Sequence, residues 1–257
     1  MQPKVKRVYL PRLKLMTAIG ASVLLVIFLT KIIVWGQRFE KQTGMTPTVL
    51  AGLVFDDGRN LKAFDGRTNV LVLGIAGGTH EGADLTDTMM VLSLAKEPKK
   101  LVLISIPRDI WSDTLKDKIN SAYHYGNEKK PGGGMILAKA IVEDVVGIPI
   151  HYGLLIDFSG FKELIDLVGG VKVKVSRSFT DPNFPISGRE NDPCQGDPKL
   201  ACRYETVQFT AGEELMAGER ALKYVRSRHA EGEEGSDFAR SRRQQEVFVA
   251  LKDKLVS

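Results

Sequence analysis

The main part of the chain lacks the excess of positive charge that binding to nucleic acid requires. The 257 residues carry a formal net charge of +5, but Lys4, Lys6, Arg7, Arg12 and Lys14 stand at the N-terminus with no acidic residue among them. These five cations account for the whole net charge, so residues 15–257 are neutral. The charge therefore gives no support for nucleic-acid binding. The chain also lacks internal repeats and low-complexity tracts, which excludes repeat architectures.

Long apolar runs are scarce, and one of them is long enough to span a membrane. Leu15–Gly36 is apolar except for Lys31, and a spanning helix needs about 20 such residues. A cleaved signal peptide is the alternative, but no small-x-small cleavage site follows the run. The basic flank predicts a cytoplasmic N-terminus. We therefore predict a cytoplasmic tail (1–14), a transmembrane anchor (15–36), an extracellular linker (37–66) and one extracellular domain (67–257).

Cysteine is also scarce. Cys194 and Cys202 are the only two, and they lie eight positions apart in one loop. In an exported domain this spacing favours a disulfide that closes the loop. A metal site is the alternative, although no histidine or third cysteine lies nearby.

Apolar runs separated by glycine and proline predict an α/β domain. Strands and helices do not alternate strictly, so we expect a central mixed sheet covered by helices. We expect strands at Asn69–Gly74, Met89–Leu94, Leu101–Ile106, Tyr152–Ile156, Val171–Val175 and Val207–Phe209, and a short one in the linker at Thr48–Val54. We expect helices at Met135–Val146, at Phe158–Val168, at Ala211–Val225 with Leu215, Ala221, Leu222 and Val225 inward, and after Ser236 with Val247, Phe248, Leu251 and Leu255 inward. Ser176–Tyr204 is expected to be irregular.

Arginines are concentrated near the C-terminus. Five of them fall within eighteen positions, at 226, 228, 240, 242 and 243. The planar guanidinium binds phosphate oxygens two at a time. Nucleic acid and ATP are scarce outside a cell, so a phosphorylated envelope intermediate is the expected ligand. The alternative is a set of solvated surface arginines paired with Glu231, Glu233 and Glu234.

Charged residues also follow predicted strands upstream. Arg108 and Asp109 come directly after an apolar strand and a proline, a typical position for a site on a loop. Asp84 and Asp87 lie near the start of a strand, where carboxylates can hold Mg²⁺ together with substrate phosphate. Turn formation and capping are their alternative roles. Lys118 is either a further phosphate ligand or an ordinary surface lysine.

These segments, taken in order, resemble the LytR-CpsA-Psr family of cell-envelope phosphotransferases. The resemblance covers roughly Asn69 to Leu255. It rests on Leu73-Gly74, Asp87-Thr-Met-Met90, Ser105-Ile-Pro-Arg-Asp109, Lys118-Ile-Asn-Ser-Ala-Tyr123, Val168-Gly-Gly-Val171, Ala221-Leu-Lys-Tyr-Val-Arg-Ser-Arg228 and Asp237-Phe-Ala-Arg-Ser-Arg-Arg-Gln-Gln245.

The resemblance implies an α/β/α fold with a mixed sheet and an apolar groove for a prenyl chain. It also implies transfer of a glycopolymer phosphate from a polyprenyl pyrophosphate carrier to a hydroxyl of a cell-wall glycan. The implied pyrophosphate ligands are Arg108, Lys118, Arg226, Arg228, Arg240 and Gln244. Asp87 is the implied Mg²⁺ ligand, with Asp84 as a second candidate. Asp109 and Asp237 would orient the arginines, and Asp87 and Asp109 are candidate general bases.

One position departs from the family pattern. Ala76 stands about where many members carry a metal-binding aspartate after the first strand. Asp84 or His80 could substitute for it, or fewer protein ligands could hold the metal. Two other functions remain open: a non-catalytic binder of anionic envelope polymers or lipid carriers, and a membrane-tethered transcription regulator. The neutral domain and the lack of a DNA-binding helix pair disfavour the regulator.

Overall fold

The computed structural model describes Thr30 and residues 61–78, 82–95 and 100–256. The strands and helices described here all belong to one compact unit, Ala63–Ser257. Within those residues, no helix has both the length and the apolar character needed to cross a membrane. Apart from Thr30, the predicted anchor 15–36 lies outside the described residues, as do the linker strand Thr48–Val54 and His80.

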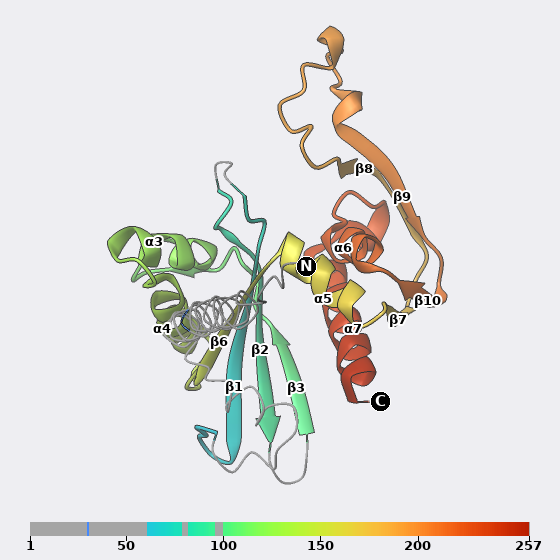
Figure 1. The fold of residues 1–257 in the computed structure, drawn as a ribbon. Helices are drawn as coiled ribbons and strands as arrows, with labels where there is room; N and C mark the ends of the chain where they lie inside the picture. Colours follow the sequence, from blue (N-terminus) through green and yellow to red (C-terminus); the bar gives the residue numbers. More distant parts are fainter. Residues whose placement is uncertain (1–29, 31–60, 79–81, 96–99, 257) are drawn as a thin grey trace, which may run out of the picture. The chain divides into compact units, whose positions relative to one another are not determined.

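A four-stranded mixed sheet forms the centre of the domain, as the sequence predicts (Figure 1). Its order is β3 (Lys100–Ser105), β2 (Thr86–Ala95), β1 (Arg67–Ile75) and β6 (Tyr152–Asp157). β1 pairs antiparallel with β2 and parallel with β6. Parallel pairing requires a crossover between β1 and β6. That crossover carries β4 (Trp111–Ser112), β5 (Asp117–Lys118), η1 (Ile119–Ser121), α3 (Ala122–Lys129) and α4 (Gly134–Val146).

The two faces of the sheet bury different residues, because successive side chains of a strand point to opposite sides. Leu71, Leu73 and Val91 pack with Ile141 and Val142 of α4 in one core cluster. Val72 and Met90 face the other way and line a groove beneath α5 (Phe158–Leu167), α6 (Gly218–Arg226) and α7 (Asp237–Val256). The sheet therefore carries helices on both faces.

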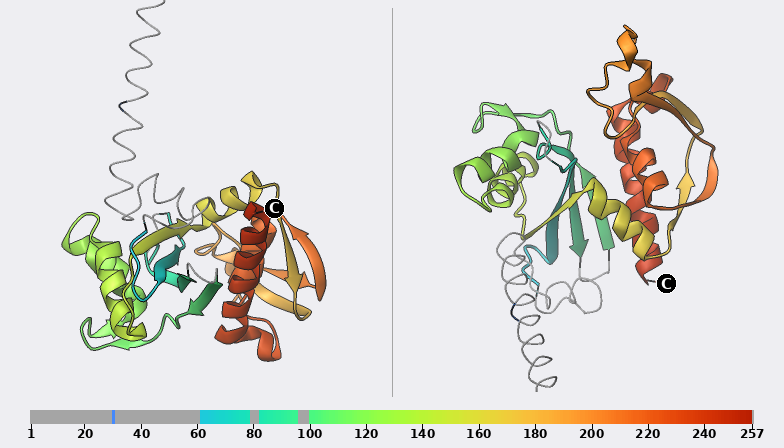
Figure 2. Two further views of the ribbon diagram at one scale, coloured as in Figure 1. Left: turned by 90° about the horizontal axis from the view of Figure 1, so that it is seen from below. Right: turned by 45° about the horizontal axis from the view of Figure 1, so that its top comes forward.

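A second core cluster holds the C-terminal part together. α7 packs against β7 (Val171–Val175) and α6, and α6 also packs against α5 (Figure 2). β7 pairs with β10 (Gly212–Met216), and β8 (Phe179–Pro185) pairs with β9 (Tyr204–Phe209). In this core Phe179 stacks on Phe209 and on Tyr224, and the rings of Phe209 and Tyr224 meet in a tilted arrangement. The cluster fixes the positions of α6 and α7, which carry most of the candidate site.

Two expectations about this part of the chain are wrong. Ala211–Val225 is not one helix, because Gly212–Met216 pairs with the free edge of β7 and Ala217 is extended. Leu215 is consequently 68% exposed and does not face inward. Ser176–Tyr204 is not wholly irregular, because Phe179–Pro185 forms β8. A register shift between Asp181 and Phe184 breaks the strand periodicity that would have revealed it.

Two smaller differences concern helices. Leu255 is 51% exposed at the end of α7 and is not an inner residue, because the helix extends past its packing partners. α3 has no counterpart among the expected elements. Its residues lack an apolar face, and it packs mainly against α4.

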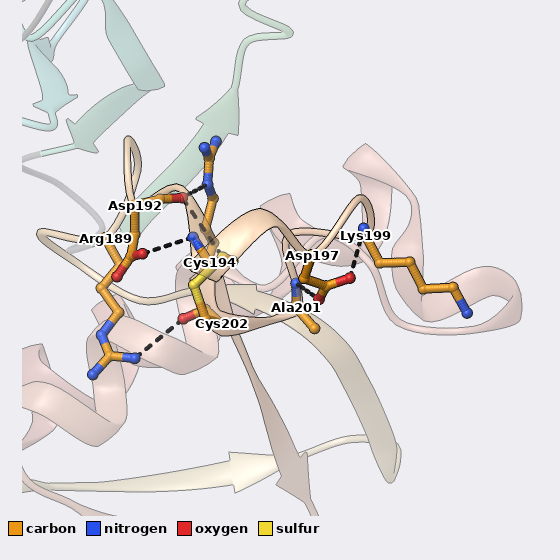
Figure 3. The surroundings of a disulfide bond; sticks show 8 residues. Arg189, Asp192, Cys194, Asp197, Lys199, Ala201 and Cys202 are labelled. Atoms are coloured by element: carbon orange, nitrogen blue, oxygen red, sulfur yellow. Dashed lines mark hydrogen bonds between the residues drawn. A yellow bond between two sulfur atoms is a disulfide. The ribbon is translucent and has the colours of Figure 1, made fainter.

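The two cysteines form the expected disulfide in the loop between β8 and β9 (Figure 3). Their Cα atoms lie 5.5 Å apart. The loop around them is closed by side chains that accept backbone N–H groups: Asp192 from Cys194 at 2.8 Å, and Asp197 from Lys199 at 2.9 Å. Asp192 lies close to both sulfurs, but the sulfurs are joined to each other, so the disulfide replaces the alternative of a metal site.

Candidate functional site

The groove between the sheet and the helices is apolar along most of its length. It has a volume of about 300 Å³. Its walls come from both sides of the domain, with β1, β2 and β6 forming the floor. The apolar lining is Val72, Met90, Leu154, Ile156, Phe158, Phe161, Leu164, Pro185, Leu222, Val225, Val247, Phe248 and Leu251. Such a lining suits a hydrocarbon chain.

Three arginines give the groove a cationic end. Arg226 and Arg228 stand at the C-terminal end of α6, and Arg240 lies in the first turns of α7. The Arg226 guanidinium lies over the Phe158 ring, 4.1 Å from its centroid. Arg240 is only 7% exposed, and its one ion pair among the described residues joins it to exposed Asp237 at 2.9 Å.

Two of these arginines carry their charge in unfavourable surroundings, with Arg240 buried and Arg226 partly buried. Burial lowers the pKa of both Arg226 and Arg240, and the neighbouring charge of Arg228 lowers each further. Arginine nevertheless stays protonated in proteins. The end of the groove is therefore a candidate site for an anion.

A line of alternating charges leads from this end to the loop after β3. Asp87 accepts hydrogen bonds from Arg108 and, at 3.3 Å, from Arg228. Asp109 lies 3.4 Å from Arg108 Nε and accepts a hydrogen bond from Lys118 at 2.7 Å. The Lys118 bond and the charge of Arg108 hold the pKa of Asp109 below its ordinary value, against the opposing effect of burial.

One polar atom in this line is weakly paired. Arg108 Nε is buried and makes no hydrogen bond within the part of the chain that the structure describes, and its contact with Asp109 at 3.4 Å is an ion pair alone. An oxyanion bound beside Arg108 would be a hydrogen-bond acceptor for this atom.

Gln244 joins the helix side of the groove to the sheet side. It shares one face of α7 with Arg240, and its Nε2 donates to Thr88 Oγ1 at 2.9 Å. The floor here requires Gly74, because a Cβ at that position would lie 2.9 Å from Thr88 Cβ. The predicted residues Arg228, Arg240, Gln244 and Asp87 thus meet in one groove, with Arg108, Asp109 and Lys118 continuing outward from Asp87.

The other two arginines of the C-terminal cluster lie outside the groove. Arg243 is fully buried and does not line the groove. It donates to the carbonyls of Tyr224 and Ser227 and pairs with Glu234 at 3.1 Å. Arg242 is partly exposed and binds Glu234 at 2.5 Å. The interpretation of surface arginines paired with the glutamates of the preceding turn therefore fits Arg242, whereas Arg243 stabilises the end of α6.

The two candidate metal carboxylates have different surroundings. Asp87 lies in the groove, whereas Asp84 contacts His124 Nδ1 at 2.9 Å. The hydrogen bond to Asp84 raises the pKa of His124. Over the described ranges, the one cluster of three metal-ligand side chains contains the bonded cysteines. Asp87 is thus the candidate metal carboxylate that lines the groove, which also has Asp157 in its lining.

Three residues of the site were not predicted from the sequence. His229 and Asp157 line the groove. Asp157 directly follows the predicted strand Tyr152–Ile156, so the rule that drew attention to Arg108 could have found it. Asp181 lies in the segment expected to be irregular, and no sequence signal identifies it.

Asp181 holds the turn that presents Arg228. Its carboxylate is fully buried and accepts hydrogen bonds from Ser227 Oγ at 2.5 Å, Arg228 N at 3.0 Å and His229 N at 3.1 Å. Burial alone would raise the pKa of Asp181, but the hydrogen bonds from Ser227 and the backbone outweigh it and lower the pKa below 3.8. The turn is therefore fixed by an ionised carboxylate.

We expect Asp181 to make the stability of the domain depend on acid pH. Because its folded pKa is lowered, its stabilising effect is complete above its ordinary pKa of 3.8 and is lost as pH falls through the folded pKa. Asp181→Asn should reduce the free energy of unfolding at pH 7 by about 1.5–3 kcal/mol and should flatten its acid dependence. Urea unfolding between pH 3 and 7 measures both. An unchanged acid slope in the variant would contradict the role given to Asp181.

A groove with an apolar body and a cationic end, in a mixed α/β domain, defines a candidate site for an amphiphilic anion. The model of the LytR_cpsA_psr family matches residues 41–257, and the chain belongs to this family. The family expected from the sequence motifs is thereby confirmed.

Named relatives and a solved structure extend this finding. The chain is 29% identical over 190 residues to the polyisoprenyl-teichoic acid–peptidoglycan teichoic acid transferase TagU of Bacillus anthracis, covering 72% of this chain and 52% of the relative. It is 31% identical over 198 residues to the regulatory protein MsrR of Staphylococcus aureus, covering 75% and 50%. The chain thus spans about half the length of the curated relatives it matches.

The fold is similar to that of the Bacillus subtilis protein YwtF (TagT), solved with bound octaprenyl pyrophosphate lipid. The TM-score is 0.50 and the identity 26%, over 77% of this chain and 66% of that chain.

Proposed function

We propose that this protein transfers a glycopolymer, as a sugar phosphate, from a polyprenyl pyrophosphate carrier to a hydroxyl of a cell-wall glycan. The observation that carries the proposal is the joining of an apolar groove to the buried guanidinium of Arg240. A prenyl chain would lie in the groove and its pyrophosphate at the arginines. The teichoic acid transferase among the relatives and the prenyl pyrophosphate bound in the similar structure support this ligand class.

The direction of the charge line favours an in-line displacement. With the prenyl chain in the groove, the leaving polyprenyl phosphate lies on Arg226, Arg228 and Arg240. Arg108 and Lys118 lie farther out and would hold the sugar-linked phosphate. The acceptor hydroxyl attacks that phosphorus from the side opposite the groove, and the bond to the bridging oxygen breaks. Catalysis rests mainly on positioning and charge neutralisation.

We assign to Asp109 the role of general base, which takes the proton of the acceptor hydroxyl. It is 44% exposed and lies outside the groove, on the side from which the acceptor would approach. Its lowered pKa keeps it ionised at neutral pH, and its pairing with Lys118 and Arg108 fixes its orientation. Asp237 orients Arg240 in the same way, through the pair at 2.9 Å.

The residues present fit Mg²⁺ held by one protein carboxylate. Mg²⁺ commonly binds one or two carboxylates together with substrate phosphate oxygens, and Asp87 is a carboxylate among the proposed phosphate ligands. When bound, the ion would neutralise phosphate charge. Asp84 is engaged with His124, so we assign it no metal role.

The predicted segment 15–36 would anchor the protein in the cell membrane, with the N-terminus cytoplasmic and the domain outside. This topology would bring the groove to a lipid-linked substrate at the outer surface. The disulfide suits an oxidising exterior.

Removal of metal tests the proposal. EDTA should lower the transfer rate by about tenfold or more, because phosphate charge is then left to the arginines alone, and added Mg²⁺ should restore it. Asp87→Asn should raise the Mg²⁺ concentration that gives half of the maximal rate, whereas Asp84→Asn, the matched control, should leave it unchanged. The measurement is transfer from a defined prenyl-pyrophosphate saccharide to wall glycan.

The same assay separates the enzyme from a non-catalytic binder. A binder retains farnesyl pyrophosphate in EDTA and in Asp87→Asn but transfers nothing under any condition. Transfer that is insensitive to both EDTA and Asp87→Asn would refute the metal assignment.

A further inference from the structure

An exposed tryptophan stands beside the outer end of the charge line. Trp111 is 59% exposed and lies on β4 directly opposite Lys118 of β5. Residues directly opposite in an antiparallel pair put their side chains on the same face, with Cβ atoms about 5 Å apart. The indole therefore shares a face with the ammonium group that binds Asp109.

This position lies outside the apolar groove. Neither Trp111 nor Lys118 lines the groove, whereas Asp87 does. The polar contacts run from Arg228 through Asp87, Arg108 and Asp109 to Lys118. A substrate whose lipid lies in the groove and whose two phosphates lie along this line must direct its remaining part toward Trp111.

The hairpin that carries Trp111 is ordered by its own hydrogen bonds. Ile119 N donates to Ile110 O and Lys116 N to Ser112 O, each at 2.8 Å. On the opposite face of the hairpin, Tyr125 donates to Asp117 at 2.7 Å. The indole is thus presented on a fixed backbone, which limits the entropy lost when a ligand stacks on it.

We propose that Trp111 is a stacking platform for a pyranose ring of the saccharide that takes part in the transfer. The C–H groups on one face of a pyranose carry partial positive charge, and the face of an indole is negative. Lys118 beside it would bind hydroxyl oxygens or the sugar-linked phosphate. This inference rests on the proposed function, and it adds a saccharide site that the charge line alone does not define.

The chain has two tryptophans, so Trp35→Phe in the full protein leaves Trp111 as the single fluorescent reporter. Three probes are titrated: farnesyl pyrophosphate, the same lipid pyrophosphate carrying an N-acetylglucosamine disaccharide, and free chitotetraose. Calorimetry follows binding of each probe independently. We expect a sugar-bearing probe to change Trp111 emission, and farnesyl pyrophosphate to bind without changing it.

Variants measure the contribution of the ring. Trp111→Ala should weaken binding of the sugar-bearing probe by about three- to tenfold and leave the affinity for farnesyl pyrophosphate unchanged. Trp111→Phe should keep most of the affinity. Phe64→Ala is the matched control, because Phe64 is similarly exposed (56%) but precedes β1, whose other end reaches the groove. Phe64→Ala should leave the affinities for the sugar-bearing probe and for farnesyl pyrophosphate unchanged.

The probes also distinguish the two sources of a pyranose. A response to the lipid-linked disaccharide alone supports the donor saccharide, a response to chitotetraose alone supports the acceptor glycan, and a response to both supports a path shared by the two. No response of Trp111 to either sugar overturns the inference, whether or not farnesyl pyrophosphate binds. Failure of farnesyl pyrophosphate to bind overturns the proposed function separately.

Discussion

Replacing Arg240 by methionine should abolish most transfer without destabilising the domain. Methionine keeps much of the apolar volume of the side chain but removes its charge. Loss of one preorganised donor to a developing oxyanion costs about 10²–10³-fold in rate, so we expect kcat/KM to fall by that factor. The residue is 7% exposed and makes one ion pair in the described structure, to exposed Asp237.

The thermal stability of the Arg240→Met variant should not fall with its activity. Burial and the charges of Arg228 and Arg108 disfavour the protonated guanidinium of Arg240, as its lowered pKa shows. The free protein therefore holds this charge at a cost, and its removal should leave the melting temperature unchanged or raise it.

Transfer kinetics and thermal unfolding of the same preparation check both results. Arg177→Ala is the control, because Arg177 is a surface arginine whose partner Glu233 is also exposed. A methionine variant that unfolds at lower temperature and retains transfer would show that Arg240 is structural.

Replacing Arg243 by alanine should have the reverse effect, a loss of stability without a direct effect on substrate binding. Its guanidinium is fully buried, accounts for four hydrogen bonds and lies over the Phe179 ring, 4.6 Å from the centroid. Removal leaves Glu234 and two carbonyls of the α6 end without this partner. Breaking a buried ion pair costs about 3–5 kcal/mol, which corresponds to a fall of roughly 10 °C in melting temperature for a domain of this size.

Arg242→Ala is the matched control for this second prediction. Arg242 is the next residue of α7 and shares Glu234, but its side chain is 37% exposed. We expect its removal to cost less than about 1 kcal/mol. If Arg243→Ala has the same melting temperature as the native protein but loses transfer activity, Arg243 is a substrate ligand and our assignment is wrong.

We thus expect different roles for Arg240 and Arg243, three positions apart on one helix, and their sequence spacing alone does not reveal which role each has. Arg240 and Gln244 are four apart and share the groove face, as the helical repeat predicts. The partners that decide the role are distant in sequence: Asp87 lies 141 residues before Arg228, and Thr88 lies 156 residues before Gln244. Such contacts depend on how β2 and α7 are placed by the rest of the fold.

Local sequence pattern also predicts part of the fold, whereas contacts between distant segments decide the rest. The strands of the central sheet are largely apolar runs, and the middle parts of β1 and β2 are buried on both faces, so local composition identifies them. β8 and β10 were not predicted because long-range pairing overrides local pattern. Gly212–Met216 has a helical arrangement of apolar residues around it but pairs with β7, and β8 contains prolines and a register shift but pairs with β9.

The fate of the two phosphorus atoms of the donor shows which phosphate the protein transfers. A lipid-linked saccharide is prepared with one isotope in the sugar-linked phosphate and another in the prenyl-linked phosphate, and is incubated with the protein, Mg²⁺ and wall glycan. We expect the sugar-linked label to appear in the glycan and the prenyl-linked label to be released as polyprenyl monophosphate, and we expect Arg240→Met to suppress the formation of both products. Recovery of both labels on the lipid after the saccharide has moved to the glycan would contradict this expectation.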